Sequence, residues 1–384
     1  MTQPLKGLKV LELARILAGP WMGQILADLG ATVIKVESPG GDDTRSWGPP
    51  FITRDDLPEE APTAAYFYCA NRGKQSVVAD FRDPEDLAFV QELADGADVL
   101  LENFKLGGLK KFGLDFEALA ARNPGLVYCS VTGFGQTGPY AARAGYDYLV
   151  QGMAGLMSVT GEAEGQPMKV GVAVTDIVAG LYGVIGIQAA LAERARTGRG
   201  QHVDVSLFDS ATALMANQAM NYLATGVSPV RMGNQHPNIA PYQVFDLADG
   251  QVIIAAGNDG QYRRLCEAIG REDLRADPRF QSNRDRVQNR DLLVAELAAS
   301  LAAWTRADLL ARLEKAVVPS APINSMAEVF ADPQIVARGL RIDPEGIPGV
   351  RTPLVFSSSE LELEHSAPGL DQHGAQIRRN GWND

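Results

Sequence analysis

The 384-residue chain has few of the side chains that most often bind metals or form catalytic triads. It contains three cysteines, Cys69, Cys129 and Cys266, which are far apart and form neither a CxxC pair nor a Cys/His ligand spacing. This pattern argues against a disulfide framework or a zinc site and favours buried thiols in a reducing compartment. With only four histidines, the chain also offers few candidates for a triad centred on histidine.

Excess positive charge and targeting segments are scarce as well. The net charge is −12, so no global basic field exists to attract nucleic acid or an anionic membrane surface. The first residues reach a strand-like apolar run at once, without the basic start and apolar core of a signal peptide. We therefore expect a cytoplasmic protein that has no nucleic-acid or membrane partner. An anionic small molecule is compatible with the composition if local Lys and Arg side chains line its site.

Several nucleotide-binding and hydrolase motifs are absent or incomplete. The chain has no GxxxxGK[ST], no GxSxG and no HExxH sequence. Residues 133–138, GFGQTG, match GxGxxG by letter, but Pro139 follows and no glycine-rich helix opens there. An acidic residue for the ribose is also missing at the distance of about 20 residues that dinucleotide folds use. These departures argue against NAD(P) binding.

Strands and helices alternate through the first third of the chain. Apolar, strand-like runs at residues 8–14, 31–37, 76–81, 97–104 and 125–135 are separated by the helix-like segments 22–30, 83–96 and 114–124. This alternation predicts an α/β fold with an open parallel sheet of Rossmann type. A long polar loop at residues 38–63 interrupts the alternation, and loops of this length are often functional.

The pattern changes in the second half of the chain. Small-residue helices dominate residues 144–205, a strand is expected at 201–207, and another apolar helix is expected at 209–226. A strand pair at 242–257, with a turn at Asp249-Gly250, then opens a separate α/β module. We expect a large Rossmann-like domain from residues 1–225, a smaller α/β domain from residues 226–325, and a return to the large domain over residues 326–384.

Residues 170–191 form the most unusual segment, because they are almost wholly apolar and hold one charge, Asp176. A single carboxylate in such a segment is unfavourable unless it is paired, protonated or used. A transmembrane helix fits the length, but the central Asp, a Gln and repeated Gly argue against it. Two interpretations stay open on these residues alone: a buried helix whose Asp caps a helix N-terminus, and a carboxylate that faces a pocket and reacts there.

An ordered set of short motifs resembles a known family. The set comprises LKVLELARILAGP (8–20), GDDTRSWGPPF (41–51), NRGKQS (71–76), ENF (102–104), TGFGQTGP (132–139), AGYD (144–147), TD (175–176), TGRGQ (197–201) and GNQHPNIAPYQVF (233–245). Together these motifs resemble the class III CoA-transferases, which include formyl-CoA transferase, carnitine CoA-transferase and the α-methylacyl-CoA racemases. The greatest similarity is to dicarboxylate transferases of the succinate–hydroxymethylglutarate (glutarate) type.

The resemblance implies that Asp176 is a catalytic nucleophile. It would attack an acyl-CoA thioester, giving an aspartyl anhydride, then an aspartyl-CoA thioester from which an acceptor acid takes the CoA. The implied substrates are an acyl-CoA donor, succinyl-CoA in the closest subgroup, and a free carboxylic acid, with no metal or other cofactor. The resemblance also implies that the large domain binds CoA and that two chains interlock in a homodimer.

For CoA itself, the resemblance assigns residues at the exits of the expected strands. They are Ala18, Arg82, Asn103, Phe104, Lys105, Lys111, Gly145, Tyr146 and Asp147. Other interpretations stay open, since Lys105 and Lys111 fit a solvated basic turn, Arg82 fits an exposed surface position, and Ala18 fits tight packing. A substrate loop is implied at Gly233, Asn234, Gln235 and His236, where His236 also fits a polar loop residue. Arg45 is a candidate for a substrate carboxylate, or else an ordinary surface arginine.

Two departures from the family patterns help to sort its activities. Leu17 stands where formyl-CoA transferase has Gln, so oxalate-type chemistry is not expected. The racemases carry a GHD motif, whereas this chain has Tyr146 between Gly145 and Asp147. A phenol with a pKa near 10 is a poor base at pH 7, which favours a transferase over a racemase. A racemase and a non-catalytic CoA-binding protein stay as alternatives.

Overall fold

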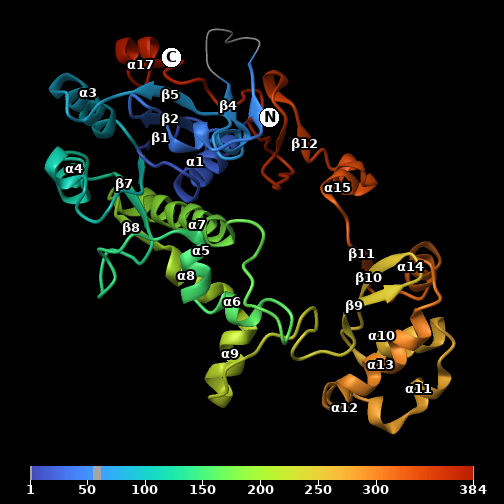
Figure 1. The fold of residues 1–384 in the computed structure, drawn as a ribbon. Coiled ribbons are helices and arrows are strands. Elements are labelled where there is room, and N and C mark those ends of the chain that lie inside the picture. Colours follow the sequence, from blue (N-terminus) through green and yellow to red (C-terminus); the bar gives the residue numbers. More distant parts are fainter. Residues whose placement is uncertain (1, 55–61, 384) are drawn as a thin grey trace. The chain divides into compact units, whose positions relative to one another are not determined.

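In a computed structural model, which describes residues 2–54 and 62–383, the chain folds into two units (Figure 1). The larger unit comprises Met1–Leu156, Lys169–Gly226 and Pro333–Asp384, and the smaller comprises Met157–Met168 and Val227–Asp332. The domain boundaries expected at residues 225 and 325 stay a prediction.

The larger unit is built on a six-stranded sheet in which every neighbouring pair is parallel. The strand order is β5-β2-β1-β6-β7-β8, with β1 (Lys9–Glu12), β2 (Thr32–Glu37), β5 (Gln75–Val78), β6 (Val99–Glu102), β7 (Val127–Thr132) and β8 (His202–Ser206). Each strand coincides with an apolar run that predicted it, so the α/β class with a parallel sheet is confirmed. Both faces of the sheet are covered, as such continuous apolar strands require.

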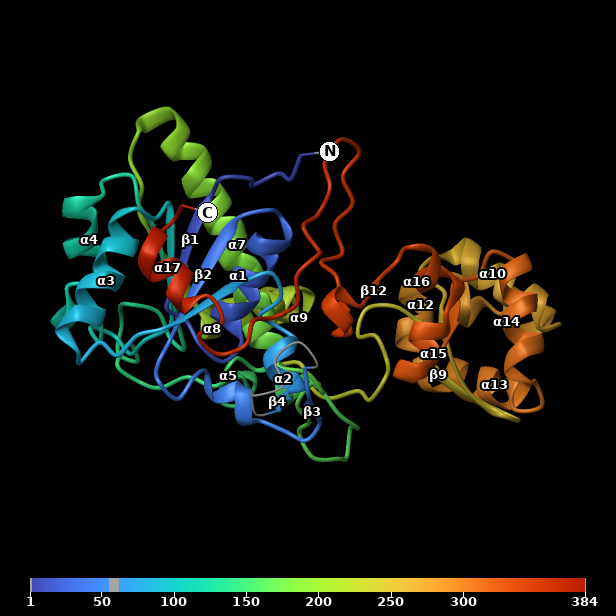
Figure 2. The same cartoon turned by 90° about the horizontal axis from the view of Figure 1, so that it is seen from above.

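Helices cover the two faces of the sheet (Figure 2). On one face, α1 (Ala18–Asp28), α7 (Val174–Thr197), α5 (Asp147–Met153) and α8 (Leu207–Leu214) share a core with alternate strand residues such as Val10 and Val99. On the other face, α3 (Pro84–Asp95), α4 (Phe116–Arg122) and the C-terminal α17 (Gly374–Asn380) pack on Leu11 and Leu100. The period of two along each strand thus divides the core into two layers.

Local signals set several of these helix ends. Asp83 accepts hydrogen bonds from the amides of Glu85 and Asp86, and Pro84 occupies the first turn, so α3 begins there. Gly198 adopts a left-handed conformation with φ 71° and ends α7. By length and composition α7 is the one helix in the described residues that could cross a membrane, but a buried core helix passes the same test.

Two sequence expectations for helices are wrong in detail. Residues 144–205 contain only one long helix, α7, because glycines and Pro167 break the chain between residues 155 and 171. The expected helix at 209–226 is two helices, α8 and α9 (Ala216–Thr225), since Ala216 has a positive φ of 39°. The loop at 38–63 contains a 3₁₀ turn, Asp43–Ser46, and two short strands, β3 (Phe51–Ile52) and β4 (Thr63–Ala64), and part of it lies outside the described residues.

The smaller unit has a three-stranded antiparallel sheet of order β11-β10-β9. Its strands are β9 (Tyr242–Leu247), β10 (Gly250–Ala255) and β11 (Ser320–Pro322), and its helices are α10 (Asp259–Ala268), α11 (Glu272–Ala276), α12 (Asn283–Gln288), α13 (Arg290–Leu301), α14 (Arg306–Lys315) and α15 (Met326–Ala331). Phe280, Leu297 and Leu309 form part of its own hydrophobic core.

The remaining short elements are α2 (Ala65–Tyr68), α6 (Leu156–Val159), α16 (Pro333–Ala337), β12 (Arg341–Ile342) and β13 (Gly349–Val350). Within the larger unit, the C-terminal segment contacts the N-terminal part through Asp28, a fully buried residue at the end of α1. Its carboxylate accepts hydrogen bonds from Arg72 Nε at 3.1 Å and from the Thr352 amide at 3.2 Å. One buried carboxylate therefore ties together three segments that are distant in sequence.

Replacing Asp28 by Ala is expected to lower the free energy of unfolding by about 3–5 kcal/mol, because Arg72 would stay buried without its anion. Urea titration measures this change. The matched control is Asp95→Ala, which removes the partner of Arg122 from an exposed pair and should change the free energy by less than about 1 kcal/mol. Similar small effects for both variants would contradict the role assigned to Asp28.

Candidate active site

A cavity of about 430 Å³ lies where the carboxyl ends of β1, β6 and β7 meet. It is lined by the segments that follow these strands, together with the Arg143–Asp147 segment and Asp176. The lining residues are Arg15, Ile16, Leu17, Ala18, Asp43, Trp47, Asn103, Phe104, Lys105, Leu106, Val131, Thr132, Gly133, Ala141, Ala142, Arg143, Ala144, Gly145, Tyr146, Asp147, Asp176 and Leu207. Open α/β sheets bind their ligands at this edge.

Asp176 lies in the first turn of α7, which packs against α1. The backbone amide of Ala18, the first residue of α1, interacts favourably with the ionised Asp176 carboxyl group and acts to lower its pKa. Leu17, at the N-cap position of α1, offers no capping side chain. Asp176 therefore occupies the place of a capping group for a neighbouring helix, and it does so from inside the cavity.

A second carboxylate, Asp147, fixes the start of α7. One of its oxygens accepts hydrogen bonds from the Thr175 amide at 2.9 Å and from the Thr175 hydroxyl at 2.8 Å. The other oxygen accepts from the side-chain amide of Gln151 at 2.7 Å, and Gln151 in turn accepts from the Val170 amide. Since the N-cap residue of α7 makes no side-chain cap, Asp147 supplies the missing acceptor from α5. The residue beside Asp176 is thereby held in place.

The electrostatic environment makes Asp176 unusual among the carboxylates of the chain. Burial, and then the nearby charge of Asp147, raise the pKa of Asp176 to about 7, although the Ala18 amide acts in the opposite direction. A carboxylate that only capped a helix would be expected to have a lowered pKa. Burial, together with the charges of Cys69 and Asp176, also raises the pKa of Tyr66 to about 12. A strongly shifted group in a cavity is a candidate for catalysis.

A close approach of two glycines shapes one wall of the cavity. A Cβ atom at Gly133 would lie 2.4 Å from the Cα of Gly145, and one at Gly145 would lie 2.2 Å from the Cα of Gly133. Any side chain at either position would clash with backbone. The first glycine of the GFGQTG sequence is therefore explained by packing that brings the Tyr146-Asp147 segment against the end of β7.

The structure brings most of the expected site residues together. Ala18, Asn103, Phe104, Lys105, Gly145, Tyr146, Asp147 and Asp176 all line the cavity. Arg82 and Lys111 instead line a neighbouring cavity of about 440 Å³, of which Phe104 is also part. Arg82 is exposed there and forms an ion pair with Asp80 at 2.7 Å.

The expected substrate loop, Gly233, Asn234, Gln235 and His236, belongs to the smaller unit. Within that unit the Gly233 amide donates to Gly161 O at 3.0 Å. Arg290 donates to the backbone carbonyls of His236 and Pro237. Burial and the Arg290 charge lower the pKa of His236. Hydrogen bonds to the backbone of the loop thus anchor it at both ends.

The positions of two arginines differ from what the sequence indicated. Arg45, a candidate for a substrate carboxylate, donates to Glu37 at 2.8 and 2.7 Å and stacks over Phe67, so it is a structural residue. Arg143 had not been expected in the site, yet it lines the cavity and stacks over Tyr140 at 3.9 Å. Its signal in the sequence was its position just before the AGYD motif.

Residues 5–374 match the sequence profile of CoA-transferase family III. The chain belongs to this family. A succinate–glutarate CoA-transferase of Agrobacterium fabrum is 54% identical over 97% of this chain and 94% of its own length. An acetyl-CoA:oxalate CoA-transferase of Acetobacter aceti is 41% identical over 98% of this chain and 95% of its own. The crystal structure of a CAIB/BAIF family protein from Brucella suis has 58% identity and a TM-score of 0.89, with 99% of each chain covered.

As a family III member, the chain is a CoA-transferase, and the resemblance recognised in its motifs is confirmed. The cavity that holds Asp176 combines cationic side chains, apolar walls and one carboxylate with a shifted pKa. This combination suits a ligand that is anionic at one end and reactive at the other.

The raised pKa of Asp176 has a consequence for stability. A group whose folded pKa is about 7 and whose unfolded pKa is near 4 opposes folding when it is ionised, so stability falls as the pH rises between these values. Asp176→Asn should therefore be more stable than the parent at pH 8, by on the order of 1–4 kcal/mol. Urea unfolding should show this gap shrinking toward pH 5.

Asp43→Asn is the matched control, because Asp43 is an exposed carboxylate that lines the same cavity. It should show no comparable gain at pH 8. A gain for Asp176→Asn of equal size at pH 8 and pH 5 would contradict the assigned pKa shift.

Proposed function

We propose that this CoA-transferase moves CoA from succinyl-CoA to a free dicarboxylic acid such as glutarate, with Asp176 as the nucleophile. The observation that carries the proposal is the position of Asp176, whose carboxyl group faces the cavity beside the Ala18 amide and has a pKa near neutrality. Glutarate is favoured over oxalate as the acceptor because the succinate–glutarate relative is 54% identical and the oxalate relative 41%.

The first half of the reaction forms an enzyme-bound thioester. An Asp176 oxygen attacks the thioester carbonyl of succinyl-CoA, and the C–S bond breaks to give a mixed anhydride and CoA thiolate. The thiolate then attacks the aspartyl carbonyl, which releases succinate and leaves CoA on Asp176. A carboxylate suits this exchange because an anhydride and a thioester are both reactive acyl groups, whereas a serine ester would be too stable to return the acyl group readily.

The second half reverses these steps with the acceptor. A carboxylate of the incoming acid attacks the aspartyl thioester, which gives a new anhydride and frees the thiolate again. The thiolate attacks the acceptor's carbonyl, so the new acyl-CoA leaves and the Asp176 carboxylate is restored. In each attack on the aspartyl carbonyl, negative charge develops on the carboxyl group that the Ala18 amide already favours in its ionised form, so this amide would stabilise the developing charge.

These two cavities of the larger unit, that of Asp176 and that of Arg82 and Lys111, would take the two ends of CoA. Arg15, Asp43 and Phe104 line both of them, so the cavities are neighbours on the sheet edge. The other cavity is lined by Phe81 and Phe112, which suit an adenine ring, and by Arg82 and Lys111, which suit phosphates. The thiol end would then enter the cavity of Asp176. The partly apolar wall there limits access of water, which would hydrolyse an anhydride.

The covalent step predicts a mass change. Incubation with succinyl-CoA should add CoA, with loss of water, to the peptide that contains residue 176, and glutarate should remove the adduct as glutaryl-CoA. Asp176→Asn should form no adduct and lose about 10³-fold or more in turnover, as removal of other nucleophiles does. Intact-protein and peptide mass spectrometry measure the adduct.

Asp95→Asn, which changes an exposed carboxylate on α3, serves as the control and should retain the adduct. Transfer at the normal rate by Asp176→Asn would refute the proposal. Incorporation of deuterium from heavy water without acyl transfer would favour the racemase instead, and binding without any turnover would favour a CoA-binding protein.

A Rossmann-like description of the larger unit and an interlocked homodimer belong to the same proposal. When the six strands of this sheet are numbered in chain order, β5-β2-β1-β6-β7-β8 has the order of the dinucleotide fold, which supports the first part. Exposed apolar side chains support the second. They are Leu181, Tyr182 and Ile185 on α7, and Met220, Tyr222 and Leu223 on α9. Leu181, Tyr182 and Ile185 lie within about one turn of α7, and monomers seldom expose large contiguous apolar patches.

Ile185 is 61% exposed and is expected to lie in the contact between two copies. Ile185→Asp should therefore shift the protein from dimer toward monomer, since a charge would be buried without a partner. Light scattering after size-exclusion chromatography measures the mass. Ala88→Asp adds the same charge at an exposed position of α3 and should leave the dimer intact. A parent protein that runs as a monomer at micromolar concentration would contradict the dimer.

A further inference from the structure

The loop that leads into α1 contains a strained residue next to the candidate active site. Ile16 has a φ of 74°, in the left-handed region that β-branched residues avoid. Such a conformation costs about 1–2 kcal/mol and persists only where the surroundings impose it. Ile16 lines the cavity, and two residues later the Ala18 amide interacts with the Asp176 carboxyl group and acts to lower its pKa. The strained backbone thus determines where that amide points.

Side chains from two other loops hold this segment. The Asp42 carboxylate accepts from the Ile16 amide, at 3.2 and 3.3 Å to its two oxygens. Asn103 holds the preceding residue, because it accepts from the Arg15 amide at 3.0 Å and donates to the Arg15 carbonyl at 2.7 Å. Asp42 is itself fixed by the Thr44 amide and hydroxyl, at 3.0 and 2.8 Å.

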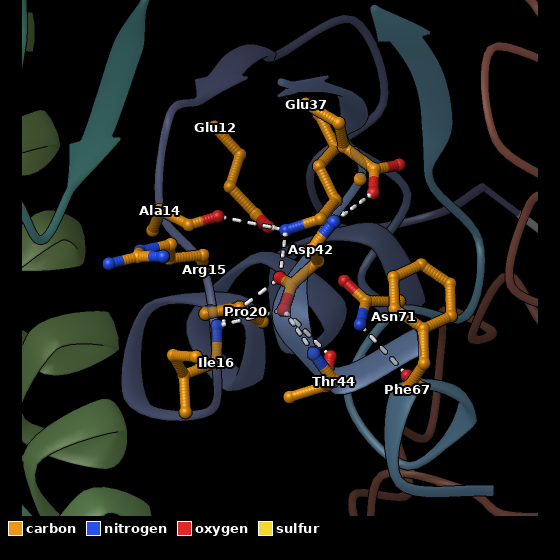
Figure 3. A network of polar contacts seen from close by, with 12 residues as sticks. Glu12, Ala14, Arg15, Ile16, Pro20, Glu37, Asp42, Thr44, Phe67 and Asn71 are labelled. Atoms are coloured by element: carbon orange, nitrogen blue, oxygen red, sulfur yellow. Dashed lines mark hydrogen bonds and ion pairs between the residues drawn. The ribbon is translucent and has the colours of Figure 1, made fainter. Parts of the chain in front are cut away.

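Asp42 belongs to a buried network of ion pairs (Figure 3). Lys35 contacts Asp42 and Glu12, each at 3.0 Å, and donates to the Ala14 carbonyl at 2.8 Å. Lys74 contacts the other side of Glu12 at 2.8 Å. All four side chains are buried. Burial alone would lower the pKa of Lys35, but Glu12, Asp42 and Glu37 raise it, so Lys35 stays charged. Asp42 therefore has a fixed cation 3.0 Å from the carboxylate oxygen that also accepts from the Ile16 amide at 3.2 Å.

We propose that Asp42, oriented by Lys35, is a positioning residue that holds Ile16 in the left-handed conformation and so directs the Ala18 amide at the reacting carboxyl of Asp176. This inference rests on the proposed function, since it gives Asp42 a part in the reaction at Asp176. Asp42 lines the neighbouring cavity rather than that of Asp176, and its side chain is fully buried, so it acts on Asp176 through the backbone of residues 16–18. Its removal should affect the chemical steps more than the binding of acyl-CoA.

Asparagine at position 42 is the most informative change. Asp42 accepts from Thr44 with one oxygen and from Lys35 with the other, and Ile16 donates between them. An Asn has only one acceptor oxygen, so its NH₂ group must face either the Thr44 donors or Lys35. Asp42→Asn should lower kcat by about 10- to 100-fold, as small displacements at active sites do, with little change in KM for succinyl-CoA.

A rescue experiment separates positioning from general stability. Glycine adopts the left-handed region without strain, so adding Ile16→Gly to Asp42→Asn should restore part of the turnover that Asp42→Asn loses. Ile16→Ala is the matched control, because alanine shortens the side chain but still disfavours this conformation, and it should not rescue Asp42→Asn. The rate of adduct formation on Asp176 in a single turnover is the second readout and should follow kcat.

If Asp42→Asn does not fold, the double variant Lys35→Met/Asp42→Leu removes both charges without leaving either one unpaired, and the same fall in kcat is expected. Unchanged kcat in a folded Asp42 variant, or a loss that Ile16→Gly and Ile16→Ala restore equally, would overturn the inference. Adduct formation by the parent but not by Asp176→Asn tests the proposed function separately. The experiments can therefore refute the positioning role of Asp42 and still support Asp176 as the nucleophile.

Discussion

The electrostatic interaction between the Ala18 amide and the Asp176 carboxyl group is the one on which the candidate site depends. It joins the first turns of two helices, α1 and α7, that begin about 150 residues apart in the chain and pack against each other on one face of the sheet. A helix N-terminus favours negative charge through its unpaired amides and its dipole. Here the charge comes from a side chain that can itself react.

Aspartate serves opposite purposes on the two sides of the segment that precedes α1. Asp42 lies next to Lys35, and this charge keeps the pKa of Asp42 below its usual value despite burial. Asp176 lies next to Asp147 instead, and burial and that like charge raise its pKa. The difference follows from the neighbours rather than from depth alone. A permanently ionised carboxylate suits a scaffold, while one near neutrality can give up its charge to a covalent bond.

The sequence predicted the parallel sheet because each strand is a short apolar run, as in Leu8–Ala14, and the runs alternate with amphipathic helices. It also singled out Asp176, since a lone charge in an apolar segment is conspicuous. It did not indicate Asp42 or Lys35 as partners, because their pairing depends on how the loop after β2 folds back against that strand. Nor does any local pattern mark Ile16, whose left-handed conformation contradicts the preference of its own side chain.

A glycine at position 16 would have allowed the same backbone conformation without strain, so the use of isoleucine needs a reason. Glycine also allows many other conformations, and the segment would then be restrained by its hydrogen bonds alone. Isoleucine has few alternatives once Asp42 holds its amide, which leaves one orientation for the Ala18 amide. The proposed reaction passes through two anhydrides and a thioester on the same carboxyl group. A donor that must serve each of these in turn benefits from a backbone that does not adjust between them.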